Sequence, residues 1–149
     1  MARKNVEDWK CSVGRSATVL GDRWTIMVLR EALLGSTRFI DFQTNLGLAP
    51  DVLTDRLSTL VEYGVMTRES YQEPGQRARP SYHLTPAGRE LHVLVGAYQQ
   101  WGDKHLPREE GPTVTRRAHR TDRPVHVAFI DDLGYEVAAD DVATIPTGN

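Results

Sequence analysis

The arginines near a glycine-containing turn are the residues of this chain best suited to binding a polyanion. Residues 76–89 hold Arg77, Arg79 and Arg89 and no acidic residue. A guanidinium group binds phosphate through a planar fork of donors, and arginines on a hairpin tip suit a narrow minor groove of DNA and its phosphates. The segment therefore predicts an anion-binding surface with Gln76, Arg77 and Arg79 at its tip; a plain solvated loop is the alternative.

A second candidate surface is the polar face of a helix expected at 50–63. At about 100° per residue, four apolar residues share one stripe of this helix, and carboxyl and hydroxyl groups lie opposite. A carboxylate repels phosphate, but it favours a helix N-terminus and can accept a hydrogen bond from cytosine N4. This face is therefore either an ordinary solvated surface or a reader of base edges. The residues predicted to enter a major groove are Pro50, Asp51, Thr54, Asp55, Arg56 and Ser58, of which Arg56 lies nearest the buried stripe.

Three polar residues of a short helix expected at 38–45 are candidates for contacts with the DNA backbone. Arg38 opens this helix, so both its guanidinium group and the helix N-terminus could meet a phosphate. Gln43 and Thr44 are weaker candidates for the same kind of contact.

The sequence carries no pattern typical of an enzyme or a metal site. It has no glycine-rich phosphate loop, nucleophile elbow or paired-carboxylate arrangement. The five histidines are scattered without the spacing of metal ligands. We therefore expect no catalysis, no metal and no cofactor.

Composition is typical of one domain with a small appendage. The 149 residues are 40% hydrophobic and 26% charged, with a net charge of −2. No apolar run approaches the roughly 18 residues of a membrane span, and the start lacks a signal-peptide pattern, so a cytoplasmic location is expected. The single cysteine, Cys11, excludes an internal disulfide. Residues 1–110 carry 14 basic and 14 acidic residues, so DNA binding would depend on local basic clusters.

Hydrophobic spacing and turn formers predict an α+β protein that is mainly α. Helices are expected at 12–20, 23–34, 38–45, 50–63 and 85–106, and strands at 65–72, 79–85, 124–131 and 135–138. A short helix, a tight turn, a second helix and a hairpin form a winged helix-turn-helix, whose second helix enters the major groove. The expected organisation is a winged-helix domain with dimerisation helices at 1–106, a linker at 107–118 and a metal-free β-ribbon at 119–149.

Several short motifs in residues 11–105 resemble the HxlR-type winged-helix regulators, relatives of the MarR-like group. They are a cysteine opening the first helix, Gly-x-x-Trp at 21–24, Leu-Thr-x-Arg-Leu at 53–57, Tyr-x-Leu-Thr-x-x-Gly at 82–88 and Trp-Gly at 101–102. The resemblance implies a homodimeric repressor or activator that dimerises through its terminal helices and binds a pseudo-palindromic operator. Two features depart from it: Ala49-Pro50-Asp51 replaces the usual serine and basic residue, and the tail lacks the paired cysteines that some members carry.

The resemblance also gives two residue sets a regulatory interpretation. In some such relatives the cysteine at the place of Cys11 senses oxidants or electrophiles, and a basic neighbour at a helix N-terminus favours the thiolate. The alternative for Cys11 is a small buried hydrophobe. Trp24, Tyr98 and Trp101 are expected to pack in the core or dimer, or else to line a cleft for a small effector.

Together these features predict a sequence-specific, DNA-binding transcriptional regulator, with repressor as the working expectation. Its partners would be operator DNA, a second copy of itself and a small effector, with no membrane. Oxidation of Cys11 is the alternative signal. The competing hypothesis is a winged-helix module that binds protein through its acidic helix face and does not bind DNA.

Overall fold

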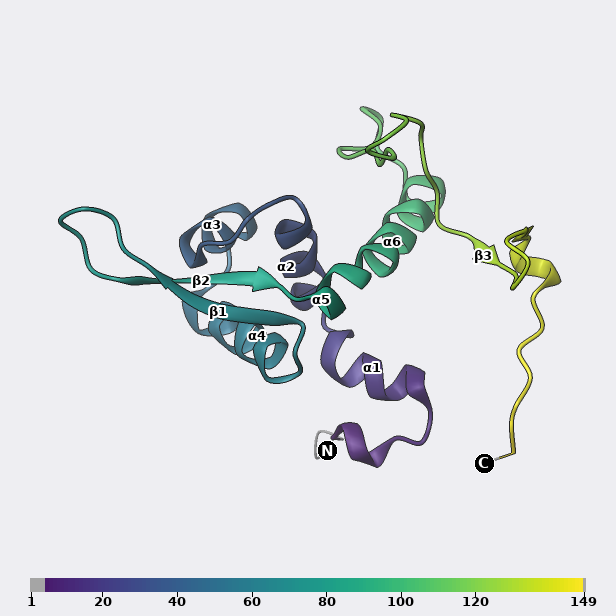
Figure 1. Cartoon of the computed structure of the whole chain (residues 1–149), viewed down its shortest axis with the longest axis horizontal. Helices are drawn as coiled ribbons and strands as arrows, with labels where there is room; N and C mark the ends of the chain where they lie inside the picture. Colours follow the sequence, from purple (N-terminus) through teal and green to yellow (C-terminus); the bar gives the residue numbers. More distant parts are fainter. Residues whose placement is uncertain (1–4, 149) are drawn as a thin grey trace. The chain divides into compact units, whose positions relative to one another are not determined.

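The computed structural model describes residues 5–148. The outermost residues of the predicted domains, 1–4 and 149, lie outside the described residues. The chain divides into two compact units, residues 1–95 and 96–149, which are described separately below (Figure 1). The first unit is a winged helix-turn-helix, which confirms the predicted fold class. No helix in the described part of the chain is long and apolar enough to cross a membrane.

Three helical elements begin the first unit: the 3-10 helix η1 (Val6–Asp8), α1 (Ser12–Leu20) and α2 (Arg23–Leu33). The predicted break between α1 and α2 is confirmed, and Asp22 is the N-cap of α2. Its Oδ1 accepts hydrogen bonds from the backbone amides of Trp24 and Thr25, at 2.9 and 3.3 Å. The cap satisfies two of the amides that a helix start leaves unpaired.

The helix-turn-helix consists of α3 (Phe39–Leu46) and α4 (Pro50–Glu62). Gly47 ends α3 in the left-handed conformation, with φ of 63°, which glycine adopts at no steric cost. Pro50 occupies the first turn of α4, where its missing N–H is no loss. The stripe predicted for α4 is confirmed, because Leu53, Leu57 and Leu60 are fully buried. They join Val28, Leu29, Phe42, Leu48, Val65, Met66, Tyr82 and Val95 in the core.

The wing is an antiparallel hairpin of β1 (Met66–Tyr71) and β2 (Arg79–Leu84), paired from Met66–Leu84 to Tyr71–Arg79. Its loop reaches well beyond α3 and α4 (Figure 1). The backbone before α3 lies beside β2, because the amide of Tyr82 donates to the carbonyl of Thr37 at 2.7 Å. This contact fixes the hairpin against the helix-turn-helix.

The helix predicted at 85–106 is two helices, α5 (Pro86–Glu90) and α6 (His92–His105). Thr85 caps α5 as expected, with its Oγ1 accepting from the amide of Gly88 at 3.1 Å. Helix α5 ends at Leu91, whose amide bonds to carbonyls within α5. The compact units divide inside α6, earlier in the chain than the expected domain boundary after 106, which stays a prediction.

The second unit contains a small β-ribbon and little other regular structure. Strand β3 (Phe129–Ile130) pairs with β4 (Glu136–Val137), and a 3-10 helix, η2 (Ala139–Asp141), follows. The predicted strands at 124–131 and 135–138 were too long. The ribbon's turn is held by Asp131, whose Oδ1 accepts from the amides of Leu133 and Tyr135 at 3.0 and 2.9 Å.

Two glutamines of α6 attach the following chain to the helix. Gln100 makes two hydrogen bonds to the backbone of Val127, one to its N–H and one to its C=O, both at 2.9 Å. Gln99 donates to the carbonyl of Val114 and accepts from Arg116. A Cβ at Gly96 would lie 3.0 Å from Val127 Cγ2, so glycine permits this close approach. Residues 107–118, predicted as a linker, thus contain points attached to α6.

Candidate nucleic-acid interface

The outward face of α4 carries the predicted base-reading groups in exposed positions. Asp51, Thr54, Asp55 and Ser58 are all exposed, while the opposite face is buried in the core. Thr54 Oγ1 donates to the carbonyl of Pro50 at 2.7 Å, which orients this hydroxyl along the helix. The side chains of Asp51 and Ser58 have no hydrogen bond to other described residues. This face presents free carboxyl and hydroxyl groups to a ligand.

Arg56 is half-buried and pairs with two carboxylates. Its Nε lies 2.7 Å from Asp22 Oδ1, and its Nη1 lies 2.5 Å from Asp55 Oδ2. The Arg56 guanidinium lowers the pKa of Asp22 through their hydrogen bond, and Asp22 in turn raises the pKa of Arg56. Arg56 was predicted to contact DNA, and its pairing with Asp22 was not predicted. The structure gives this pair the role of joining the start of α2 to α4.

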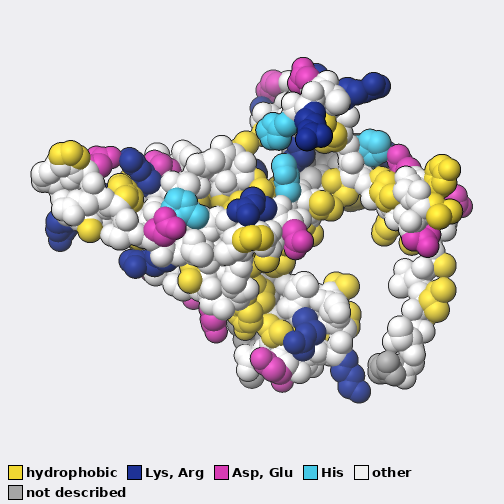
Figure 2. Space-filling model, viewed as in Figure 1, with side chains coloured by type: hydrophobic (Ala, Val, Ile, Leu, Met, Phe, Trp, Pro, Cys, Tyr) yellow, Lys and Arg dark blue, Asp and Glu magenta, His cyan; other side chains and the backbone are white. Residues whose placement is uncertain are grey.

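The tip of the wing carries the arginines that the sequence analysis singled out. Gln76, Arg77 and Arg79 are exposed, and arginine side chains lie along the hairpin (Figure 2). Neither arginine has an ion pair with another residue in the described range 5–148. Gly75, with φ of 75°, permits the turn at the tip. Two unpaired guanidinium groups at a projecting tip suit phosphate contacts.

The three residues at α3 that were predicted to contact the DNA backbone differ in their exposure and in their contacts with other side chains. Arg38 is the N-cap residue, but its Nη1 lies 2.9 Å from Glu73 Oε1 in the wing loop. Its guanidinium carbon also lies 4.5 Å from the ring centre of Tyr71. Both contacts hold Arg38 against the hairpin and reduce its availability for phosphate. Gln43 is half-buried and Thr44 is exposed.

A groove of about 580 Å³ lies between α4 and the inner face of the hairpin. Its walls are Phe39, Thr54, Ser58, Val61, Glu62, Arg68, Pro80 and Tyr82. When a helix occupies a major groove and a wing the adjacent minor groove, the DNA strand between the two grooves passes between helix and wing. The groove lies between the helix and the wing, and Arg68 and Glu62 are the charged residues of its walls.

Arg68 is the residue of this groove that the sequence analysis missed. It lies opposite Tyr82 in the hairpin register and lines the groove, with its exposed guanidinium unpaired among the described residues. The signal was present in the sequence. Side chains alternate along a strand, so Arg68 shares a face with the apolar Met66 two residues earlier.

A buried carboxylate fixes the orientation of α3 relative to α2. Glu31 is only 4% exposed, and its Oε1 pairs with Arg30 Nη2 at 2.9 Å. Its Oε2 accepts from Asn45 Nδ2 at 2.9 Å and from Ser36 Oγ at 3.4 Å. A buried charge is tolerated when it is paired and hydrogen-bonded in this way. The network is a positioning element for the helix-turn-helix, and the sequence analysis did not foresee it.

The predicted regulatory residues differ in their exposure. Cys11 is the N-cap residue of α1 and is exposed, so the alternative of a buried hydrophobe is wrong. Trp24 is partly buried against the core, whereas Tyr98 and Trp101 are 56% and 59% exposed on α6. None of the three aromatic residues lines the groove beside α4. Among residues 5–148, no group of three or more His, Cys, Asp or Glu side chains could hold a metal ion.

Comparison with known proteins agrees with this geometry. Residues 19–110 match the HxlR-like helix-turn-helix family. An HTH-type transcriptional regulator of Mycobacterium tuberculosis is 39% identical over 136 residues, covering 91% of this chain and 85% of that protein. A regulator of the same kind from Synechocystis is 32% identical over 100 residues, covering 66% of this chain and 73% of the relative.

Solved structures show the same architecture. The crystal structure of PA1607, described as a transcription factor, superposes with a TM-score of 0.78 at 33% identity and covers 93% of this chain and 96% of its own. A second transcription-factor structure, from Pseudomonas aeruginosa, has a TM-score of 0.62 at 30% identity, with 93% of each chain covered. The redox regulator HypR in its reduced form has a TM-score of 0.56 at 25% identity and covers 64% of this chain and 96% of its own.

Proposed function

Because this chain belongs to the HxlR-like helix-turn-helix family of transcriptional regulators, which are not enzymes, we propose that it binds a specific operator sequence and represses the adjacent genes. In this proposal, α4 reads bases in the major groove, and the wing contacts the minor groove and the backbone. The protein acts in the cytoplasm as a homodimer on a pseudo-palindromic site.

The observation that carries the DNA-binding proposal is the arrangement around the groove beside α4. Free polar groups of α4 form one wall, Arg68 of β1 lies across from them, and Arg77 and Arg79 extend from the same hairpin. Phosphate contacts supply most of the affinity and base contacts supply the specificity. Asp51 is therefore assigned to base reading, with the attraction coming from the wing, while the Asp55 carboxylate is paired with Arg56 and leaves one oxygen for the same role.

We further propose that an effector or oxidation of Cys11 changes the spacing of the two α4 helices. A dimeric helix-turn-helix protein binds two half-sites one helical turn apart, so a small change in spacing weakens binding. Support for oxidation comes from the exposed thiol at the start of α1 and from the likeness to the redox regulator HypR. Small molecules that act at the aromatic residues Trp24, Tyr98 and Trp101 are the second candidate signal.

A mobility-shift assay on the DNA upstream of the protein's own gene tests the proposal. We expect retention of this DNA at a protein concentration that does not retain an unrelated fragment, with affinity falling steeply as salt rises. Absence of binding to any fragment from the gene neighbourhood would overturn the DNA-binding proposal. It would favour the competing hypothesis, in which the acidic face of α4 binds a protein.

A further inference from the structure

The C-terminal unit has a defined backbone but no hydrophobic core of its own. Apart from Gly96, no described residue from 96 to 148 is buried. Hydrogen bonds nevertheless fix the Asp131 turn, the ribbon and the attachment to Gln100. Ordering a chain costs backbone entropy at every residue, and these exposed hydrogen bonds do not offset that cost. The unit therefore needs stabilisation from outside itself.

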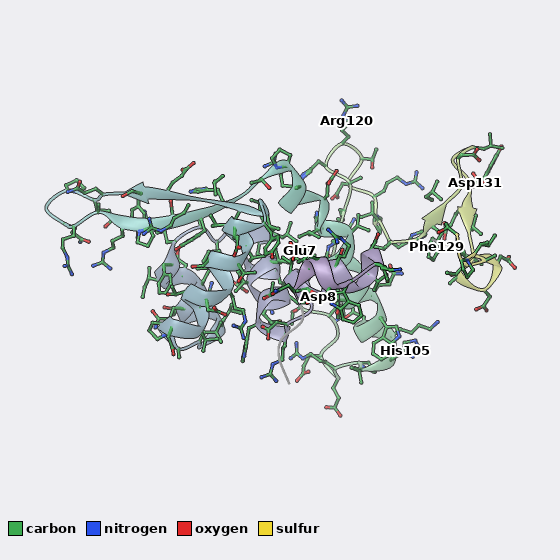
Figure 3. The ribbon with its side chains drawn as sticks, turned by 90° about the horizontal axis from the view of Figure 1, so that it is seen from below. Glu7, Asp8, His105, Arg120, Phe129 and Asp131 are labelled. Carbon is green, nitrogen blue, oxygen red and sulfur yellow. The ribbon has the colours of Figure 1, made fainter. Side chains whose placement is uncertain are left out.

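The ribbon exposes an apolar surface that the isolated chain leaves in water. Hydrophobic side chains gather on it in the surface view, and Phe129 lies on β3 (Figures 2 and 3). The exposed apolar residues of the ribbon and its turn, with their fractional exposures, are Phe129 57%, Ile130 60%, Leu133 78% and Tyr135 69%. Exposed apolar side chains gathered on one small element are typical of a surface that binds another molecule.

Small units without a core are usually held by a disulfide, a metal or association with another chain. A disulfide within the unit is excluded, because the only cysteine of the chain is Cys11. A metal has no group of suitable side chains in the described part of the chain. Association with another protein surface is the remaining source of stability.

The charges of the unit indicate what that surface is. Residues 116–123 carry Arg116, Arg117, Arg120 and Arg123 with one acid, Asp122, which pairs with Arg117. Residues 131–141 carry Asp131, Asp132, Glu136, Asp140 and Asp141. Arg120 and Arg123 form no ion pair with the acidic segment or with any other described residue, and Arg120 lies at the tip of its loop (Figure 3). In a two-fold dimer every contact is made twice. If one segment of a subunit meets a second segment of its partner, the reverse contact is made as well. The unit thus carries both halves of a charge-complementary contact.

We propose that a second copy of this chain covers the ribbon, so that the C-terminal units of two subunits share one core. The apolar ribbon would pack against the partner's unit, and the 116–123 loop of each subunit would face the 131–141 segment of the other. The same unit also exposes Tyr98 and Trp101 on α6, which Gln100 ties to the ribbon. The inference rests on the proposed homodimer and assigns the tail to its interface.

Sedimentation equilibrium of the full chain without DNA tests this assignment. We expect wild type to be dimeric and the double variant Phe129→Ser/Ile130→Ser to dissociate at least about tenfold more readily, because buried apolar anchors dominate interface energies. The matched control is Leu34→Ser, which alters the C-cap residue of α2, 53% exposed and outside the unit. Ribbon variants that dimerise as tightly as the control would overturn the proposal.

A charge-reversal series tests the same contact without depending on a folded ribbon core. Arg120→Glu/Arg123→Glu should weaken dimerisation at low salt, and adding Asp140→Lys/Asp141→Lys should restore it. If the added substitutions do not restore dimerisation, the two charged segments do not face each other across the interface.

Hydrogen exchange over a dilution series adds an independent readout: ribbon amides should lose protection as the dimer dissociates. Protection that is unchanged in the monomer would mean that the chain covers its own ribbon. Because no DNA is present, these results are independent of the mobility-shift test.

Discussion

Arg68 is the residue whose charge is best placed to hold a DNA strand between α4 and the wing. Its guanidinium lines the groove and is unpaired among the described residues. We predict that Arg68→Ala weakens binding to all DNA sequences about equally and lowers the slope of log K against log salt by about 1. Fluorescence anisotropy over a salt series measures both quantities.

Two variants make the Arg68 prediction specific. Arg68→Lys keeps the charge and should keep most of the salt slope. Arg108→Ala removes an exposed arginine that lies outside both the groove and the proposed dimer contact, and it should leave the slope unchanged. A salt slope that is the same in wild type and in Arg68→Ala would show that Arg68 does not contact a DNA phosphate.

Asp51 raises a different question, because a carboxylate on the DNA-facing helix either selects bases or merely repels phosphate. Its side chain is exposed, has no partner among the described residues and lies in the first turn of α4. We predict that Asp51→Ala changes the preference among operator variants more than the mean affinity, since an acid can accept from cytosine N4. Binding to a panel of single-base operator variants measures this, with Glu90→Ala as the exposed-acid control. A uniform gain on every sequence would identify Asp51 as a repulsive bystander.

The Asp22–Arg56 pair predicts a pH dependence of stability. The pKa of Asp22 is lowered in the folded protein by its hydrogen bond to Arg56, while the unfolded chain has the ordinary value near 3.8. The unfolded state therefore binds more protons as the pH falls, so the stabilisation is present above about pH 4 and is lost below it. Urea unfolding of wild type and Asp22→Asn should differ at pH 7 and converge towards pH 3. A difference that persists unchanged at pH 3 would contradict the role of the Asp22 charge.

At the level of elements, the helix-turn-helix depends on how α3 is fixed to α2. Asn45 donates to Glu31, a carboxylate that is 4% exposed. Removing the donor leaves a buried charged oxygen short of one hydrogen bond, which costs about 1–3 kcal/mol. We predict that Asn45→Ala lowers the free energy of unfolding by that order, measured by urea denaturation. Thr44→Ala, at an exposed neighbouring position, should change it little; equal effects would show that the loss is one of helix propensity.

The elements that the sequence predicted correctly are those with local signals. Gly47 and Pro50 mark the turn of the helix-turn-helix, and Thr85 marks the start of α5, because capping and turn chemistry act over a few residues. The pairing of Arg56 with Asp22 could not be predicted, since it joins positions 34 residues apart. The strands predicted in the tail were too long, because contacts with residues far away in the sequence also decide where these strands begin. Residues expected to extend β3 use their backbone elsewhere: Val127 bonds to Gln100 of α6.

At the scale of the whole molecule, the two compact units have different roles in the proposed regulator. The first unit reads DNA through α4 and the wing, and it also carries Cys11 at the start of α1. The second unit supplies the apolar ribbon and the exposed aromatic residues of α6. A dimer that is held mainly by its second units would tolerate movement at α1 without dissociating. Such a dimer can change the spacing of its α4 helices while staying intact.

Oxidation of Cys11 tests that mechanism in the intact protein. The thiol is exposed at the N-cap of α1, so diamide can reach it and couple it to Cys11 of a second subunit as a disulfide, with diamide reduced to the hydrazine. We predict that diamide weakens operator binding at least about tenfold, which corresponds to about 1.4 kcal/mol. Dithiothreitol should reverse the effect, and Cys11→Ser should bind like reduced wild type and show no response. Sedimentation of the oxidised wild type should still give a dimer, because the ribbon contact does not involve the thiol. If Cys11→Ser loses DNA binding in diamide as wild type does, the signal acts through another residue and the small-effector route becomes the one to pursue.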